Sequence, residues 1–83
     1  MMSEPVIQYP REWSYRIIGT DEHALRQAAS ESLGPLAYQM TVSNRSHGKT
    51  YLSMNITVTV ETEAMRDQIF SALDTHPAVR FIL

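Results

Sequence analysis

The strictest pattern in this sequence is an alternation of apolar and polar residues over residues 52–60. One row of the alternation is entirely apolar and the other entirely polar: Leu52, Met54, Ile56, Val58 and Val60 against Ser53, Asn55, Thr57 and Thr59. Side chains alternate between the two faces of a β-strand, so one face of this strand is expected against a core and the other in water. A strand of this kind is typical of an antiparallel sheet that is covered on one side only.

Shorter alternating runs predict three more strands, at residues 13–19, 36–43 and 79–83. In the first run, Trp13 and Tyr15 share the face expected to be covered. The opposite face of the sheet is expected to be open and mostly polar, with Ile18 and Ile82 as its bulky apolar members. Arg16 and Arg80 are expected on that open face, on neighbouring strands.

Two stretches with helical spacing lie between these strands. The first follows an N-cap oxygen from Thr20 or Asp21 and ends at Gly34, which is followed by a proline. The second is capped by Thr62 and ends before Pro77. Their expected buried stripes are Leu25, Ala28, Ala29 and Leu33 in the first helix, and Met65, Ile69, Ala72 and Leu73 in the second.

The element order β-α-β-β-α-β predicts an α+β fold of the ferredoxin-like kind. In this two-layer sandwich, both helices cover one face of a four-stranded antiparallel sheet with strand order 4-1-3-2. A chain of 83 residues can bury only enough surface to form one core. We therefore expect a single domain over residues 11–83, preceded by a flexible segment at residues 1–10.

Composition narrows the class of function. The absence of cysteine excludes disulfides and thiol nucleophiles, and the first ten residues lack the basic start and apolar run of a signal peptide. A cytoplasmic protein that does not enter the membrane is the expectation. The formal net charge of -2 argues against nucleic acid as the main partner, because affinity for phosphates comes from clustered Lys and Arg.

Three segments carry a resemblance to a known family: Tyr9-Pro10 before the first strand, residues 48–53 at the start of the third, and the closing residues 77–83. Together they resemble the YbeD-like family of uncharacterised bacterial proteins, over nearly the whole domain. The resemblance implies a fold like that of ACT regulatory domains, which bind small ligands at dimer interfaces, and a suggested link to lipoate metabolism. The Gly-bearing first loop of ACT domains corresponds to Gly19 here.

The predicted topology gathers three connections at one end of the sheet. The first helix also begins at that end, where its free amide groups favour an anion. We therefore predict a site for a small anionic metabolite, with these residues: Gly19, Thr20, Asp21, His23, Arg45 and Lys49. A metal site formed by His23, His47 and His76 is not expected, because their spacing is not that of metal ligands.

Arg16 and Arg80 form a candidate surface for a partner protein, and an alternative is a nucleic-acid-binding domain with a local basic patch. An acylphosphatase-like enzyme is a weaker alternative, because the loop after the first strand supplies carboxylates where a phosphate would have to bind. The expected function is a non-catalytic, ACT-like regulatory or accessory module without a cofactor, as a monomer or weak homodimer.

Overall fold

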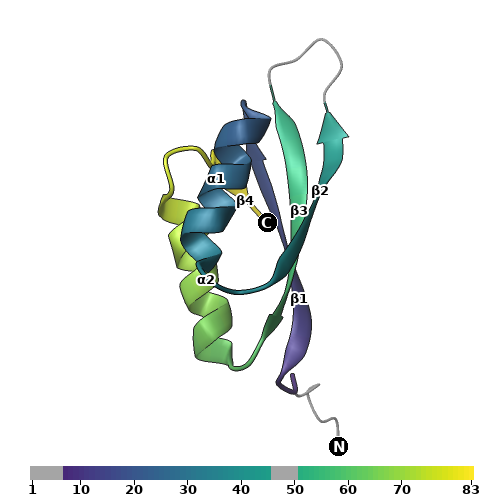
Figure 1. Ribbon diagram of the computed structural model, residues 1–83, viewed down its shortest axis with the longest axis vertical. Helices are drawn as coiled ribbons and strands as arrows, with labels where there is room; N and C mark the ends of the chain where they lie inside the picture. The colour runs from purple at the N-terminus through teal and green to yellow at the C-terminus, as the bar shows by residue number, and fades with distance from the viewer. Residues whose placement is uncertain (1–6, 46–50) are drawn as a thin grey trace, which may run out of the picture.

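A computed structural model of the chain describes residues 7–45 and 51–83. The described elements follow the predicted order: β1 (Arg11–Gly19), α1 (Glu22–Leu33), β2 (Tyr38–Arg45), β3 (Leu52–Val60), α2 (Glu63–Thr75) and β4 (Phe81–Ile82). The sheet has the order β2-β3-β1-β4, and each pair of neighbouring strands is antiparallel. Both helices lie on the same side of this sheet (Figure 1). The predicted ferredoxin-like fold is confirmed.

The core lies between the sheet and the two helices. β1 and β3 are paired along their whole length, from Arg11 opposite Val60 to Gly19 opposite Leu52. All five apolar residues of the β3 row are buried, and Ile17 and Leu25 meet them from β1 and α1 without exposed surface. The alternation over residues 52–60 therefore has the predicted cause, because one face of β3 is covered by helices.

Both helices begin at the predicted caps. The Asp21 carboxylate accepts a hydrogen bond from the His23 amide at 3.1 Å, and the Thr62 hydroxyl accepts one from the Met65 amide at 3.1 Å. Helix α1 ends at Gly34, whose φ of 60° is the left-handed region that glycine adopts without a steric penalty. These contacts satisfy amide and carbonyl groups that a helix end otherwise leaves without partners.

Strand β4 is shorter than predicted, and its alternation is shifted by one residue. Ile82 pairs with the buried Ile17, and Phe81 pairs with Ile18, so Ile82 lies on the covered face and Phe81 on the open face. The prediction that Ile82 belongs to the open face is therefore wrong. The cause is a bend at Arg80: Val79 is already buried before the strand, and the Arg80 amide donates to the Ile18 carbonyl at 2.8 Å.

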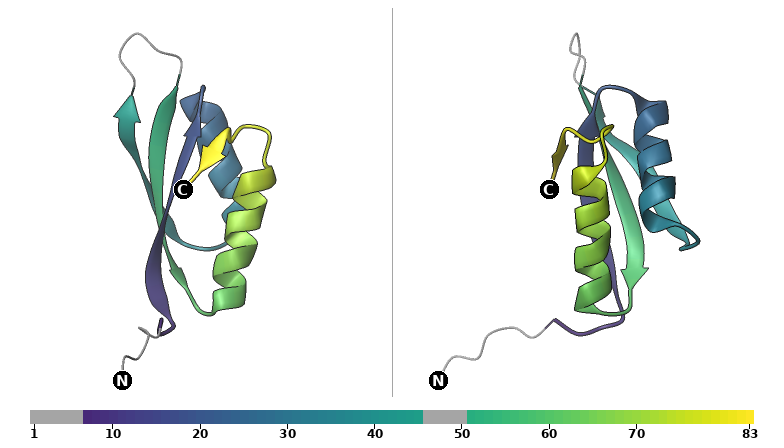
Figure 2. Two further views of the ribbon diagram at one scale, coloured as in Figure 1. Left: turned by 180° about the vertical axis from the view of Figure 1, so that it is seen from behind. Right: turned by 90° about the vertical axis from the view of Figure 1, so that its left-hand side faces the viewer.

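Because β4 is so short, β1 is covered on that side along part of its length only. The reciprocal hydrogen bonds between Arg16 and Leu83, at 2.9 and 3.2 Å, are the last in this direction among the described residues. Figure 2 shows β4 beside the upper part of β1, with the lower part of β1 extending past it. Among residues 7–45 and 51–83, no strand pairs with residues 11–15 of β1 on the side that faces α2.

Strand β2 begins two residues later than predicted and carries an irregularity between Val42 and Asn44. Val42 pairs with the buried Met54 but is itself 40% exposed. At the other end of the sheet, Tyr9 packs against the core just before β1. The flexibility predicted for residues 1–10 stays a prediction, and residues 1–6 lie outside the described part of the chain.

Candidate functional site

The open face of the sheet carries a cluster of apolar side chains at the end where β1 meets β4. We call the cluster the apolar corner; it consists of Ile18, Tyr51, Phe81 and Leu83. Phe81 is 59% exposed and Leu83 is 72% exposed. The centres of the Tyr51 and Phe81 rings lie 6.4 Å apart. The corner follows from the phase of β4, because Phe81 and Leu83 lie opposite Ile18 and Arg16 in the sheet.

Charge on the two layers of the molecule is unequal. Among the described residues, the helices and their N-caps carry six carboxylates, namely Asp21, Glu22, Glu31, Glu63, Asp67 and Asp74. The strands carry one described carboxylate, Glu12, at the far end of β1 from the corner. Next to the corner lie Arg16, whose Nε donates to Asn55 at 3.3 Å, and the exposed Arg80. No described carboxylate forms an ion pair with either arginine.

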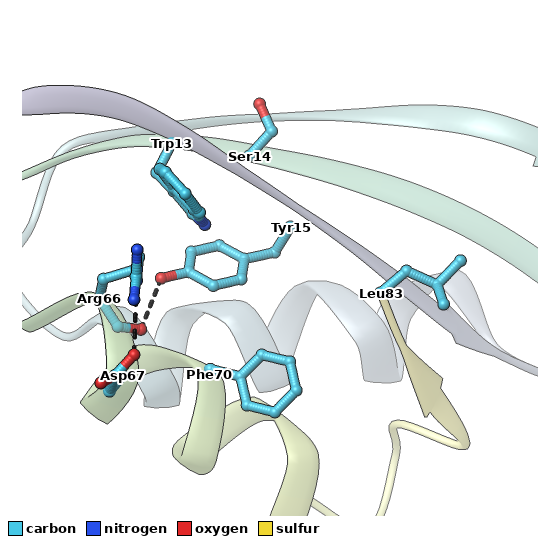
Figure 3. A pocket seen from close by; sticks show the side chains of 7 residues that line it. All are labelled: Trp13, Ser14, Tyr15, Arg66, Asp67, Phe70 and Leu83. Atoms are coloured by element: carbon cyan, nitrogen blue, oxygen red, sulfur yellow. Dashed lines mark hydrogen bonds and ion pairs between the residues drawn. The ribbon is translucent and has the colours of Figure 1, made fainter. Parts of the chain in front are cut away.

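A groove of about 310 Å³ lies between β1 and α2 (Figure 3). Trp13 and Tyr15 point from β1 toward α2, whereas Ser14 points away, as the alternation of a strand requires. The other lining residues are Arg66, Asp67 and Phe70 of α2, and Leu83. Phe70 is 41% exposed, so the groove is an apolar surface open to solvent.

Two arginines flank one indole at the end of this groove. The guanidinium groups of Arg66 and Arg11 lie 4.8 and 5.3 Å from the centre of the Trp13 ring. Arg66 also contacts the carboxylates of Asp67 at 3.4 Å and Glu63 at 4.0 Å. Arg11 has no ion-pair partner among the described carboxylates. Arg11 is therefore the positive group that an incoming ligand can neutralise.

The Tyr15 hydroxyl closes the floor of the groove. It donates to the Arg66 carbonyl at 2.7 Å, which joins β1 to α2 (Figure 3). Burial raises the pKa of Tyr15 from 10.0 to about 12, against the opposing influence of the nearby Arg66. The hydroxyl is thus protonated at neutral pH, and the Asp67 carboxylate is paired with Arg66. This arrangement suits binding better than proton transfer.

The predicted anion site at the start of α1 is built differently from the expectation. Gly19 is buried, and a β-carbon added there would lie 2.7 Å from both the Ala78 carbonyl oxygen and a methyl group of Leu25. Its small size is therefore required by packing. The Asp21 carboxylate is occupied as the helix cap, and Thr20 and His23 are exposed. A role for these four residues in ligand binding stays a prediction.

The other predicted residues of that end are placed only in part. Arg45 is the last residue of β2 and pairs with Leu52, next to Gly19 in the sheet. Lys49 and His47 lie outside the described residues. Both ring nitrogens of His76 form hydrogen bonds within the fold. Nδ1 accepts from the Ala78 amide at 3.1 Å, so Nε2 carries the proton and donates to the Glu31 carboxylate at 2.7 Å. The second hydrogen bond connects the end of α2 to α1.

The candidate partner surface of Arg16 and Arg80 was predicted without its apolar part. Both arginines are exposed near β4, but Arg80 precedes the strand. Phe81 of β4 and the following residue, Leu83, lie on the open face. The groove is not predicted from the sequence, although the alternation predicts the correct face for Trp13 and Tyr15, and Phe70 lies beside the predicted stripe of α2. The missing information was the length of β4, which decides how much of β1 it pairs with.

The described residues contain neither a metal-binding group nor a helix that could span a membrane. Within residues 7–45 and 51–83, no group of three His, Cys, Asp or Glu side chains could hold a metal ion. In the same part of the chain, neither helix has the length and apolar character needed to span a bilayer.

Comparisons with known proteins place the chain among relatives without an assigned function. Residues 4–83 match a family model described as "Protein of unknown function (DUF493)". An uncharacterized protein of Helicobacter pylori (strain J99 / ATCC 700824) is 30% identical over 74 residues, which cover 87% of this chain and 84% of the relative. These matches confirm the resemblance found in the sequence to a family of uncharacterised proteins.

The fold is shared with solved structures. The solution structure of protein HP0495 from H. pylori has a TM-score of 0.80 and 26% identity, and covers 96% of this chain and 88% of that one. A second solution structure of HP0495 has a TM-score of 0.67 at 24% identity, covering 100% and 96%. The second likeness concerns the fold alone.

Proposed function

Because the chain belongs to the DUF493 family, whose description assigns no activity, we propose its function from its own geometry: a non-catalytic accessory module that binds a partner protein through the apolar corner. The observation that carries this proposal is the exposure of Phe81 and Leu83 beside Ile18 on an otherwise polar sheet face. Clustered exposed apolar side chains with a polar surround are typical of protein interaction sites.

Charge complementarity indicates the kind of partner. Arg16 and Arg80 border the apolar corner without a described carboxylate partner, so a partner surface with apolar centre and acidic rim satisfies both parts of the site. Nucleic acid fits less well. The net charge is -2, and two of the four corner residues are aliphatic side chains, which offer no ring for a base to stack on.

The test compares two variants of the full chain as bait in a native lysate. Phe81→Ser removes the centre of the apolar corner, and Val42→Ser is the matched control, since Val42 is 40% exposed but lies on the other face, opposite Met54. We expect a protein that is captured by the wild type and by Val42→Ser to be lost with Phe81→Ser. Equal capture by all three would contradict the proposal.

Two further measurements distinguish the other occupants of the corner. Retention on single-stranded nucleic acid that needs Phe81 and weakens steeply with salt would replace the partner protein by nucleic acid. A homodimer in the wild type that dissociates in Phe81→Ser would assign the corner to a second copy of the chain. Either result would overturn the proposed partner.

A further inference from the structure

We propose that the open face of the sheet has a second contact for the same partner protein, a hollow around Glu12 that receives an arginine side chain. This inference rests on the proposed function, because it names a further group of the partner and the direction in which the partner lies on the face. The hollow has a volume of about 240 Å³, and its lining includes Glu12, Ala37, Gln39, Thr57 and Thr59. We call it the Glu12 hollow.

The strand register places the Glu12 hollow and the apolar corner at opposite ends of the open face. Arg16 and Glu12 lie on this face of β1, four residues or about 13 Å apart. Ile18 of the apolar corner lies two residues beyond Arg16. Between the two charges, the hydroxyl groups of Ser14 and Thr57 lie 3.3 Å apart and form a hydrogen bond. Along β1 the face therefore changes from apolar to positive, then to uncharged polar, and ends in a negative group.

The charge of Glu12 is not neutralised within the described part of the chain. Among residues 7–45 and 51–83, no basic side chain forms an ion pair with Glu12. The neighbouring Arg11 lies on the other face, where its guanidinium is 5.3 Å from the centre of the Trp13 ring. Residues 1–10 contain neither Lys nor Arg. Glu12 is therefore a negative group that a cation of the partner can neutralise.

The other lining residues of the Glu12 hollow favour a guanidinium group. Thr59 lies opposite Glu12, and Gln39 lies opposite Thr57, so hydroxyl and amide oxygens surround the carboxylate on three strands. A guanidinium group has five N–H donors in one plane, and it can bind a carboxylate and a neighbouring oxygen together. Ala37 has only a methyl group, which leaves space for the stem of an arginine side chain.

The occupant is a side chain of a larger partner because the contact is weak by itself. One exposed ion pair raises an affinity by up to about fivefold. The effect is useful when the partner is already held at the apolar corner, since the second contact then forms at a high effective concentration. A partner with an acidic group at Arg16 and an arginine at Glu12 can lie on the face in one direction only.

A second copy of the chain fits the charges but not the apolar corner. In a face-to-face pair with Arg16 of each copy at Glu12 of the other, Ser14 would lie on the two-fold axis. The two apolar corners would then lie at opposite ends of the pair. Each corner would face the end near Glu12, where the open-face residues of β1 and β3 are polar. A different protein is therefore the better occupant.

The direct test is an NMR titration of the full chain with N-acetyl-arginine methylamide at low ionic strength, and with the citrulline analogue, which has the same shape without the charge. We expect saturable amide shifts at Gln39, Thr57 and Thr59 with the arginine probe. The citrulline probe should bind about fivefold more weakly. Glu12→Gln should bind both probes equally. Equal binding of the two probes by the wild type, or a preference that persists in Glu12→Gln, would overturn the proposal.

Two further variants separate the shape of the Glu12 hollow from its charge. Ala37→Leu fills the hollow and keeps Glu12, whereas Thr41→Leu adds a leucine to the same face opposite Asn55, outside the hollow. We expect Thr41→Leu to bind the arginine probe like the wild type and Ala37→Leu to bind it more weakly, with wild-type amide resonances elsewhere in both. Equal binding by the two variants would overturn the hollow as the place of contact. If Ala37→Leu does not fold, Glu12→Gln still decides.

The experiments separate this inference from the proposed function. The probe titration does not use Phe81, and in the lysate experiment Glu12→Arg is added as a bait. Loss of the captured protein with both Phe81→Ser and Glu12→Arg would support both contacts. Capture that is lost with Phe81→Ser but kept with Glu12→Arg would retain the partner protein and reject the arginine contact. Probe binding that needs Glu12, with capture unaffected by Phe81→Ser, would reject the apolar corner.

Discussion

Replacing Tyr15 by phenylalanine removes the hydroxyl that joins β1 to α2. At neutral pH the variant loses a 2.7 Å hydrogen bond to the Arg66 carbonyl, so its free energy of unfolding is expected to fall by about 1 kcal/mol. The ring itself is retained, and with it the packing of a residue that is 2% exposed. The comparison therefore measures the hydroxyl alone.

The pKa of Tyr15 adds a pH dependence with a definite sign. The folded protein holds this pKa at about 12, against 10.0 for an unperturbed tyrosine, so the unfolded chain loses the phenolic proton first as pH rises. The stabilising effect is complete below pH ~10 and is lost as pH rises toward ~12. At pH 11 the loss is about 1.4 kcal/mol without screening, and solvent in the open groove reduces it toward about 1 kcal/mol.

Urea unfolding of the wild type and Tyr15→Phe, followed by Trp13 fluorescence between pH 8 and pH 11, measures the difference directly. We expect the wild type to be more stable by about 1 kcal/mol at pH 8 and the two to become nearly equal at pH 11. Tyr51→Phe, which alters an exposed ring, is the control for removal of a tyrosine hydroxyl. A difference between wild type and Tyr15→Phe that stays constant over this range would refute the reasoning.

Two further substitutions test the ends of elements. Gly19→Ala should lower the free energy of unfolding by about 1–3 kcal/mol in urea unfolding, because its β-carbon would lie 2.7 Å from the Ala78 carbonyl oxygen; unchanged stability would leave Gly19 free for another role. Thr62→Ala should cost about 1 kcal/mol by loss of the cap on the Met65 amide, and Thr62→Ser should restore most of it; equal stability of the two variants would contradict the capping role.

Much of the fold could be predicted because each element carries its own local signal. The alternation over residues 52–60 reflects burial of one face of β3, and the caps at Asp21 and Thr62 are side chains that the helices use directly. α1 ends at Gly34 because glycine can adopt a φ of 60°, which residues with a β-carbon avoid. These features depend on neighbouring residues, so the sequence contains them.

The site was less predictable because it depends on β4. The last residues, from Val79 to Leu83, are apolar except for Arg80, so either phase of alternation places apolar side chains on the covered face. The bend at Arg80 decides the phase, and it sends Phe81 rather than Ile82 to the open face. Val42 shows the same limitation at β2: it pairs with the buried Met54 but is itself 40% exposed, so alternation along a strand does not by itself determine burial.

The position of β1 between β3 and β4 also constrains how the chain folds. Neither neighbour of β1 in the sheet is its neighbour in sequence: α1 and β2 separate it from β3, and nearly the whole chain separates it from β4. Only β2 and β3 can pair as a local hairpin, so β1 joins the sheet through long loop closures whose entropy must be overcome first. The rate-limiting step of folding is therefore expected to be the docking of β1 onto this hairpin, with α1 carried along by the connection.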